Sequence, residues 1–301
     1  MKLYYFKDPE GNFGDDLNPW LWQNLLGDVF DQNTDELFVG VGTLLNHRIP
    51  KAKKVTVFGS GHGYGDIPPV NTHWQFYSVR GPLTAQALGL DLSLAITDPA
   101  ILAPLFTKQQ TNKKYPISYM PHCVSARNGD WQKVCQIAGI HYIDPRKPYL
   151  DVFKAIQQTE LLLTEAMHGA ILADAFRVHW LPVKAYKHIS EYKWQDWLQS
   201  VKVETKFNHI KPVWRGDSLY PINTKLKHKL KRVLHQTPLW QTSWQSAPPA
   251  KSSIQQLEQT ASQLKVLATS ATPQLSNQTL FLNNQEKLLD KVRQFKRDHG
   301  I

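Results

Sequence analysis

The sequence is poor in cysteine and has no long hydrophobic run, and both absences narrow the class of protein. Two cysteines in 301 residues, Cys123 and Cys135, cannot form a disulfide framework or a four-thiolate zinc site. No segment approaches the roughly 18 consecutive apolar residues of a membrane-spanning helix. The first residues also do not have the pattern of a signal peptide. We therefore expect a soluble, cytoplasmic protein.

Motifs for metal binding and for common nucleophiles are also missing. The 12 histidines are scattered, with no HExxH motif and no paired Cys/His spacing, so we expect no metal site. There is no GxSxG turn for a serine nucleophile. Cys123 directly follows His122 after an apolar run, and adjacent residues of an extended segment point to opposite sides, which disfavours a thiol nucleophile.

Acidic residues are scarce only in the last quarter of the chain. Residues 221–301 hold 12 Lys/Arg and 4 Asp/Glu, which accounts for most of the net charge of +10 and leaves the rest nearly neutral. A nucleic-acid enzyme would carry basic residues around its cleft, so we expect no nucleic-acid partner. Segment 225–235 combines an apolar helical face with lysines, and it could dock on an anionic membrane surface at the inner face of the plasma membrane. The alternative is that this helix packs on the rest of the chain.

Short apolar runs alternate with longer helical patterns, which predicts an α/β fold with mostly parallel sheets. The predicted strands are Leu3–Phe6, Leu37–Val41, Lys54–Phe58, Gln75–Val79, Leu94–Thr97, Ile117–Met120, Ile140–Ile143, Leu161–Thr164 and His179–Val183. The predicted helices are Asp16–Leu26, Leu83–Leu88, Trp131–Ala138, Tyr149–Gln157, Ala170–Phe176, Glu191–Ser200, Lys225–His235, Ile254–Leu267 and Leu280–Phe295.

The polar stretch Thr107–Tyr115 separates two series of strands, so we predict two Rossmann-like domains, 1–110 and 111–222. A basic helical extension, 223–301, follows them. Its Gln-, Ser- and Pro-rich segment 241–253 has the composition of a linker, and the helices after it could form an interaction tail.

Two glycine-containing loops follow predicted strands of the first half. In the first, Asn12 and Asp15 are candidate polar contacts at a cleft, and Gly14 permits a tight turn, although a simple turn and helix cap explains the loop equally well. In the second, Gly59, Ser60 and Gly61 would expose backbone N–H groups to an anion, the alternative being a flexible connector.

A further pair of strand-to-helix turns carries charged side chains. Arg80 ends one predicted strand, and Glu165 and His168 follow another in the second half of the chain. Ligands of parallel α/β folds bind at the carboxyl ends of strands. We therefore expect Arg80 and His168 to face each other across a cleft and to neutralise a phosphate there. Taken singly, Arg80 could instead form a surface ion pair, and His168 could cap its helix.

The chain resembles the polysaccharide pyruvyl transferase family, over roughly residues 1–200, and the later Lys193–Trp197 resembles its exopolysaccharide-biosynthesis members. The motifs that carry the resemblance are Gly11–Asp16, Gly40–Gly42, Gly59–Gly61, Val79–Thr84, Thr97–Ala100, Met120–His122 and Glu165–Ala170.

The resemblance implies a glycosyltransferase-B-like arrangement and transfer of pyruvate from phosphoenolpyruvate to sugar hydroxyls as a ketal, with no cofactor or metal. It also implies a saccharide acceptor, which can be lipid-linked. The positions of this chain that match the family's donor-binding residues are Arg80, Met167 and His168. Many family members have Arg-Leu-His where this chain has Ala166-Met167-His168.

Chemistry of this kind needs a general acid, a general base and stabilisation of the departing phosphate. We expect His168 and Arg80 to stabilise phosphate and His168 also to transfer a proton. The predicted base is Asp15 or Glu165, and His122 is a further expected substrate contact.

Two other functions fit the same observations. A sugar-nucleotide-dependent glycosyltransferase would use a similar anion-binding cleft between Rossmann-like halves. A non-catalytic scaffold of a polysaccharide assembly complex would use the C-terminal helices as its binding surface.

Overall fold

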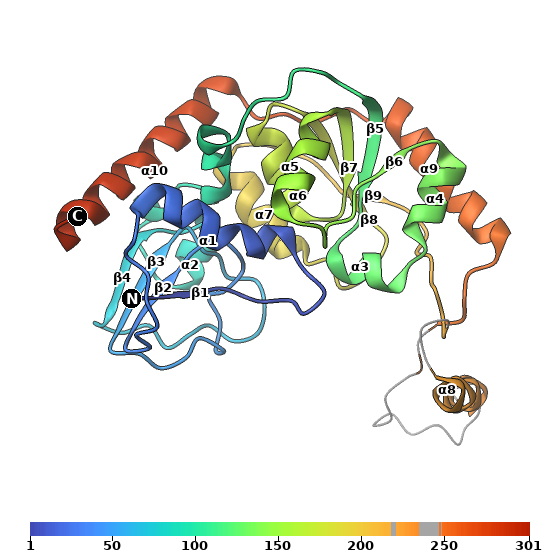
Figure 1. Ribbon diagram of the computed structural model, residues 1–301, viewed down its shortest axis with the longest axis horizontal. Helices are drawn as coiled ribbons and strands as arrows, with labels where there is room; N and C mark the ends of the chain where they lie inside the picture. Colours follow the sequence, from blue (N-terminus) through green and yellow to red (C-terminus); the bar gives the residue numbers. More distant parts are fainter. Residues whose placement is uncertain (218–220, 235–246, 248) are drawn as a thin grey trace.

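The computed structural model describes residues 1–217, 221–234, 247 and 249–301, and its framework is a pair of parallel β-sheets (Figure 1). The first sheet has the order β1-β2-β3-β4, and the second has the order β6-β5-β7-β8-β9. Their strands are β1 (Lys2–Tyr4), β2 (Glu36–Val39), β3 (Lys54–Phe58), β4 (Trp74–Ser78), β5 (Tyr115–Met120), β6 (His141–Tyr142), β7 (Thr159–Thr164), β8 (His179–Lys184) and β9 (Asn208–His209). Within the described residues, neighbouring strands of both sheets pair in parallel, for example Val57 with Phe76 and Leu163 with Leu181.

Helices connect and cover the strands, as parallel pairing requires. They are α1 (Phe13–Leu26), α2 (Pro82–Ala87), α3 (Cys123–Asn128), α4 (Trp131–Ala138), α5 (Tyr149–Gln157), α6 (Met167–Ala175), α7 (Glu191–Ser200), α8 (Ile222–Leu234), α9 (Ile254–Ser270) and α10 (Gln278–His299), with 3-10 helices η1 (Leu92–Leu94) and η2 (Pro99–Phe106). Local chemistry sets several of their ends. Asn12 caps α1 through its side chain, and Ser253 and Gln256 form a capping box at α9.

One large hydrophobic cluster joins the two halves of the chain. It contains Trp22 and Phe58 from the first half, Trp180 and Trp197 from the second, and Phe295 of α10. All five of these side chains are fully buried. The two sheets are therefore held together by a common core, and the expected boundaries 1–110, 111–222 and 223–301 stay a prediction.

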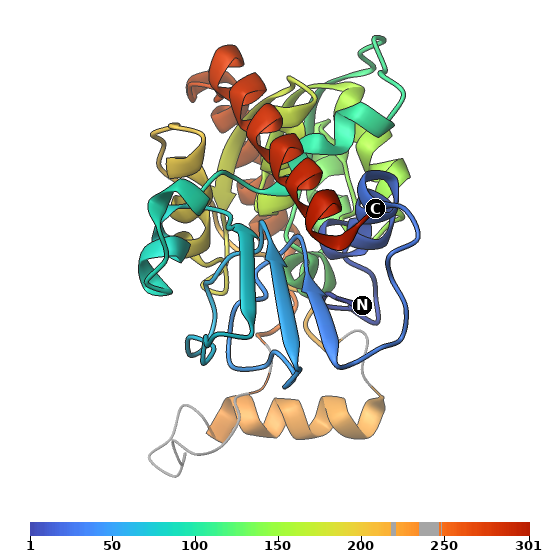
Figure 2. The ribbon, with the colours of Figure 1, turned by 90° about the vertical axis from the view of Figure 1, so that its left-hand side faces the viewer.

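Helices α9 and α10 belong to the packed body, contrary to the expected interaction tail. Leu264 of α9 lies in a second core cluster beside α4. Figure 2 shows α10 running toward the first sheet, where the ring of Phe295 lies 5.3 Å from that of Tyr77, and the Tyr77 hydroxyl donates to Asp298 at 2.8 Å. The apolar faces of both helices are covered by the chain itself, because burying them removes apolar surface from water.

Sequence and structure agree on the α/β class and on parallel strands. The expected strand Leu94–Thr97 is wrong, because Leu94 ends η1 and only Ala95 forms an isolated bridge, to Val79. No helix among the described residues is both long and apolar enough to cross a bilayer. The expected linker over 241–253 falls largely outside the described residues.

Candidate active site

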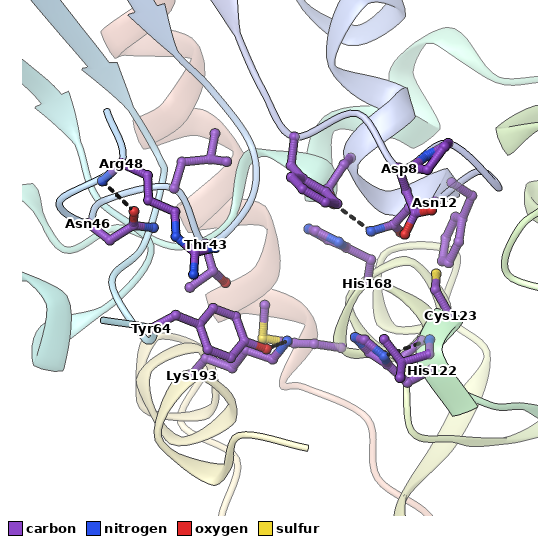
Figure 3. Close-up of a pocket in the computed structure, with 18 of the residues that line it drawn as sticks. Asp8, Asn12, Thr43, Asn46, Arg48, Tyr64, His122, Cys123, His168 and Lys193 are labelled. Carbon is purple, nitrogen blue, oxygen red and sulfur yellow. Dashed lines mark hydrogen bonds between the residues drawn. The ribbon is translucent and has the colours of Figure 1, made fainter. Parts of the chain in front are cut away.

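A pocket of about 390 Å³ lies where the carboxyl ends of strands from both sheets meet. Its lining comes from the loops after β1, β2, β3 and β5, from the start of α6 after β7, and from α7 (Figure 3). Five residues expected at the site line it together: Asn12, Asp15, His122, Met167 and His168. The pocket therefore draws its polar groups from both halves of the chain.

His168 lies in the first turn of α6 with its ring wedged between two parts of the first half. Its Nε2 is 3.6 Å from Oδ2 of Asp98, and its side chain is 12 % exposed. Neither of these two atoms has a hydrogen-bond partner among the described residues. The other edge of the ring lies against Gly14, where a Cβ atom would come within 2.1 Å of Nδ1. Gly14 is thus needed to make room for His168, and its predicted ligand contact stays a prediction.

Asp15 is the carboxylate of the pocket with the most perturbed titration. Burial raises its pKa to about 6, and the nearby His168 and Lys193 partly offset that effect. Asn12 donates its side-chain amide to the Asp15 carboxylate. A group with a pKa close to neutrality can both accept and return a proton during turnover.

Three permanent cations line the pocket, and they differ in how they are paired. Arg127 makes a two-pronged ion pair with Asp8, at 2.6 and 3.2 Å. Lys193 of α7 is only 7 % exposed, and its Nζ contacts the hydroxyl of Tyr64 at 2.7 Å. Among the described residues, neither Lys193 nor the guanidinium of the exposed Arg48 forms an ion pair with a carboxylate. Neither of these two cations is in salt-bridge contact with a described carboxylate, although Lys193 is near enough to Asp15 to lower its pKa (Figure 3).

His122 and Glu165 form a layer at the side of the pocket. Nδ1 of His122 accepts from the N–H of Val124 at 3.2 Å, and burial lowers the pKa of His122 well below its usual value. The ring is therefore neutral near pH 7. Glu165 is fully buried and outside the pocket lining, and its carboxylate accepts from the N–H of His122 at 3.3 Å and that of Ala185 at 2.7 Å. Burial raises the pKa of Glu165 to about 7. Its role as a base stays a prediction.

Arg80 does not line this pocket. Its guanidinium is fully buried, with Nε 3.0 Å from Oδ2 of Asp196 on α7, and it also donates to Oγ1 of Thr43 at 2.8 Å and to the carbonyl of His62 at 2.7 Å. The expected arrangement, with Arg80 and His168 facing each other across one cleft, is therefore not what the structure shows. Arg80 instead links the first half to α7 and supports Thr43, which does line the pocket.

The loop Gly59–Ser60–Gly61 also has a supporting position. The Ser60 hydroxyl is buried and donates to the carbonyl of Gly42 at 3.1 Å, which braces the loop that carries Thr43. At Gly61 a Cβ atom would lie 2.2 Å from Cζ of Arg80. None of the three residues lines the pocket. Their predicted ligand contacts are untested, and the contacts seen are structural.

Sequence reasoning missed four polar residues at the site: Asp98, Lys193, Arg48 and Arg127. Asp98 could have been predicted from the sequence, because it occurs in a motif that carries the family resemblance and follows an apolar run. The sequence also holds an indication for Lys193. It lies four residues before Trp197, so the two side chains share one face of the predicted helix. Arg48 occurs in a loop and Arg127 in the short helix α3, and neither segment has a pattern that indicates a site. Among the described residues no cluster of His, Cys, Asp and Glu could hold a metal ion.

Two comparisons with known proteins bear on the family of this chain. Residues 12–187 match the family model described as polysaccharide pyruvyl transferase. The chain is also 44% identical over 223 residues to the succinoglycan biosynthesis protein ExoV of Rhizobium meliloti (strain 1021), an alignment that covers 73% of this chain and 71% of that protein. The matched region contains Asp98, Glu165, His168 and most of the pocket. The chain belongs to the polysaccharide pyruvyl transferase family.

Proposed function

We propose that this protein transfers pyruvate from phosphoenolpyruvate to two hydroxyls of a sugar, forming a cyclic ketal during exopolysaccharide biosynthesis. Family membership supports pyruvyl transfer, and the relative named for succinoglycan biosynthesis supports a saccharide acceptor. The observation that carries the choice of donor is the buried Lys193, whose ammonium has no carboxylate partner among the described residues.

Phosphoenolpyruvate would supply the anionic partners that Lys193 and Arg48 lack. Its phosphate and carboxylate are anionic, and a buried ammonium is costly unless an anion compensates it. The N-terminal turn of α6, which contributes Met167 and His168 to the pocket, adds N–H groups and a positive helix end. Ala166 and Lys193 both line the pocket. Many family members have arginine at the position of Ala166, and Lys193 supplies a cation to the same pocket in this chain.

The reaction can be divided among the residues of the pocket. His168 gives a proton to the methylene carbon of phosphoenolpyruvate, which leaves an oxocarbenium-like centre at the carbon that bears phosphate. A sugar hydroxyl attacks that carbon and loses its proton to Asp15. The second hydroxyl then displaces inorganic phosphate, which leaves with the second hydroxyl proton, and the proton on Asp15 returns to His168. Lys193 and Arg48 stabilise the departing phosphate.

Asp98 is a positioning residue in this scheme, because its Oδ2 faces Nε2 of His168 at 3.6 Å while Oδ1 accepts from the N–H of Ala100. Asp98→Asn keeps the side-chain shape and the cap of η2 but removes the charge beside His168. We expect kcat to fall about tenfold to a hundredfold with KM for phosphoenolpyruvate nearly unchanged. Steady-state phosphate release measures both constants.

A matched control separates this effect from loss of a helix cap. Asp91 caps η1 in the same way, through the N–H of Ser93 at 2.7 Å, but it is exposed and outside the pocket lining. Asp91→Asn should leave both constants within about twofold of the parent. Equal losses in the two variants, or a loss that appears in KM alone, would show that Asp98 does not act through His168.

Lys193→Met tests the proposed donor site directly. Removal of the buried ammonium should lower kcat/KM for phosphoenolpyruvate by about a hundredfold, since an anion that loses its partner in a buried site loses about 2–5 kcal/mol. Lys187→Met is the control, because Lys187 is exposed and outside the pocket lining. Acceptor-dependent phosphate release gives the rates.

Ligand-induced thermal shifts distinguish the proposed donor from sugar nucleotides. Phosphoenolpyruvate should raise the melting temperature of the parent and of Lys187→Met but not of Lys193→Met. A shift with a nucleotide diphosphate sugar and none with phosphoenolpyruvate would support the glycosyltransferase alternative. Shifts of equal size in all three proteins would show that Lys193 does not bind the donor.

A further inference from the structure

We propose that α8 docks on the surface of an anionic lipid membrane, an interaction that goes beyond the proposed reaction and does not depend on it. Figures 1 and 2 both show α8 standing apart from the two sheets. No residue of α8 is buried. The apolar faces of α9 and α10, by contrast, contain the fully buried Leu264 and Leu288. Helix α8 therefore has an apolar face that the described residues do not bury.

The exposed apolar face of α8 is a continuous stripe. Ile222, Leu226, Leu230 and Val233 are 77%, 63%, 61% and 58% exposed. Their spacing of four, four and three residues places them on one side of a helix with 3.6 residues per turn. Exposure of four large aliphatic side chains in one row is costly in water, and burial of each in a lipid interface is favourable.

The charge of α8 selects the kind of partner. Residues 222–234 contain four lysines and one arginine and no Asp or Glu. By helical position, Lys225 and Lys229 border one edge of the stripe and Lys227 borders the other. Lysine stems can lie along an apolar surface while their ammonium groups reach outward to phosphate groups. An apolar stripe between basic edges fits a surface with an acyl interior and anionic headgroups, which a nucleic acid does not provide.

The contact that ties α8 to the body leaves this face free. Asp217 accepts from His228 at 2.7 Å and from Arg232 at 2.7 and 2.8 Å. Position 228 lies roughly opposite the centre of the Ile222–Val233 stripe, and position 232 lies outside the stripe, next to Lys225 around the helix. The ion pair therefore contacts α8 outside the stripe, and the four aliphatic side chains of the stripe stay exposed.

Vesicle flotation of the full-length protein tests this proposal. We expect binding to phosphatidylcholine vesicles that contain phosphatidylglycerol, little binding to phosphatidylcholine alone, and weaker binding as salt is raised. Lys225→Gln/Lys227→Gln/Lys229→Gln should reduce partition about a hundredfold, at about fivefold per basic residue. Leu226→Ser/Leu230→Ser should also abolish flotation, although it keeps every charge.

A charge-matched control shows whether net charge alone explains binding. Lys265, Lys287 and Arg297 are exposed on α9 and α10, and the triple Gln variant loses the same charge outside α8. It should float like the parent. Equal losses in the two triple variants, equal binding to neutral vesicles, or no binding to any vesicle would overturn the proposal. Phosphate release without vesicles should be unchanged in all these variants, which separates the result from that for the donor site.

Discussion

Asp15→Asn is expected to lower kcat by about 10²–10⁴-fold, the range for loss of a general base. The side chain keeps its size and its position beside Asn12 but can no longer take the proton of the attacking hydroxyl. In the parent, Asp15 must be ionised to act as the base. Because burial raises its pKa to about 6, the rate should rise with pH through about 6 as Asp15 ionises. Phosphate release at saturating donor across this range measures the effect.

The pH profile of Asp15→Asn provides the control for titration of the substrate. The phosphate of the donor also titrates near pH 6, and it does so in the same way for both proteins. The residual rate of Asp15→Asn should therefore still rise with pH as the donor phosphate ionises. The part of the rise that comes from ionisation of Asp15 should be missing. A variant that keeps the full pH profile of the parent would exclude Asp15 as the base, and the buried Glu165 would become the next residue to test.

Stability should change in the opposite direction from activity. The unfolded carboxyl of Asp15 ionises near its ordinary pKa of about 3.9, whereas the folded one ionises near 6. The unfolded state therefore releases its proton first, and the parent loses stability as pH rises from about 4 to about 6. Asp15→Asn removes this loss and should melt above the parent at pH 7. A melting temperature below that of the parent would mean that the lost activity reflects damage to the fold.

Secondary structure was predictable where periodicity was strong and the flanking residues were clear. The bounds of β3, α4, α5 and α7 agree with the expected ones. The segment Leu94–Thr97 had the composition of a strand, but Asp98 and Pro99 start η2 immediately after it and leave no room for a ladder. Apolar composition alone cannot distinguish a strand from a short buried connector.

The site was predictable to the extent that it depends on topology. Asn12, Asp15, His122 and His168 follow strands, and parallel strands bring their carboxyl ends together. Partners were not predictable, because they depend on contacts between distant segments. Asp196 lies 116 residues after Arg80, and nothing in the local sequence indicates that their side chains meet. The same strand-end position therefore places His168 in the pocket lining but places Arg80 in a buried ion pair outside it.

The buried ion pair between Arg80 and Asp196 leads to the second large expected effect. Arg80→Met should lower the free energy of unfolding by about 3–5 kcal/mol, because it leaves the fully buried Asp196 carboxylate without its cation. The exposed Arg293, which pairs with Glu286 at 2.6 Å, is the control, and Arg293→Met should leave the free energy of unfolding nearly unchanged. Denaturant unfolding measures both differences.

A double variant separates a structural role of Arg80 from donor binding. Asp196 also accepts from the N–H of Thr84 at 2.9 Å, and Asp196→Asn can keep that acceptor while removing the charge. Arg80→Met/Asp196→Asn should therefore recover most of the lost stability, although it still lacks the guanidinium. If Arg80 acts by linking α7 to the loop of Thr43, donor-dependent phosphate release should return to within about tenfold of the parent along with the fold. Recovery of stability without recovery of activity would instead place Arg80 in contact with the donor.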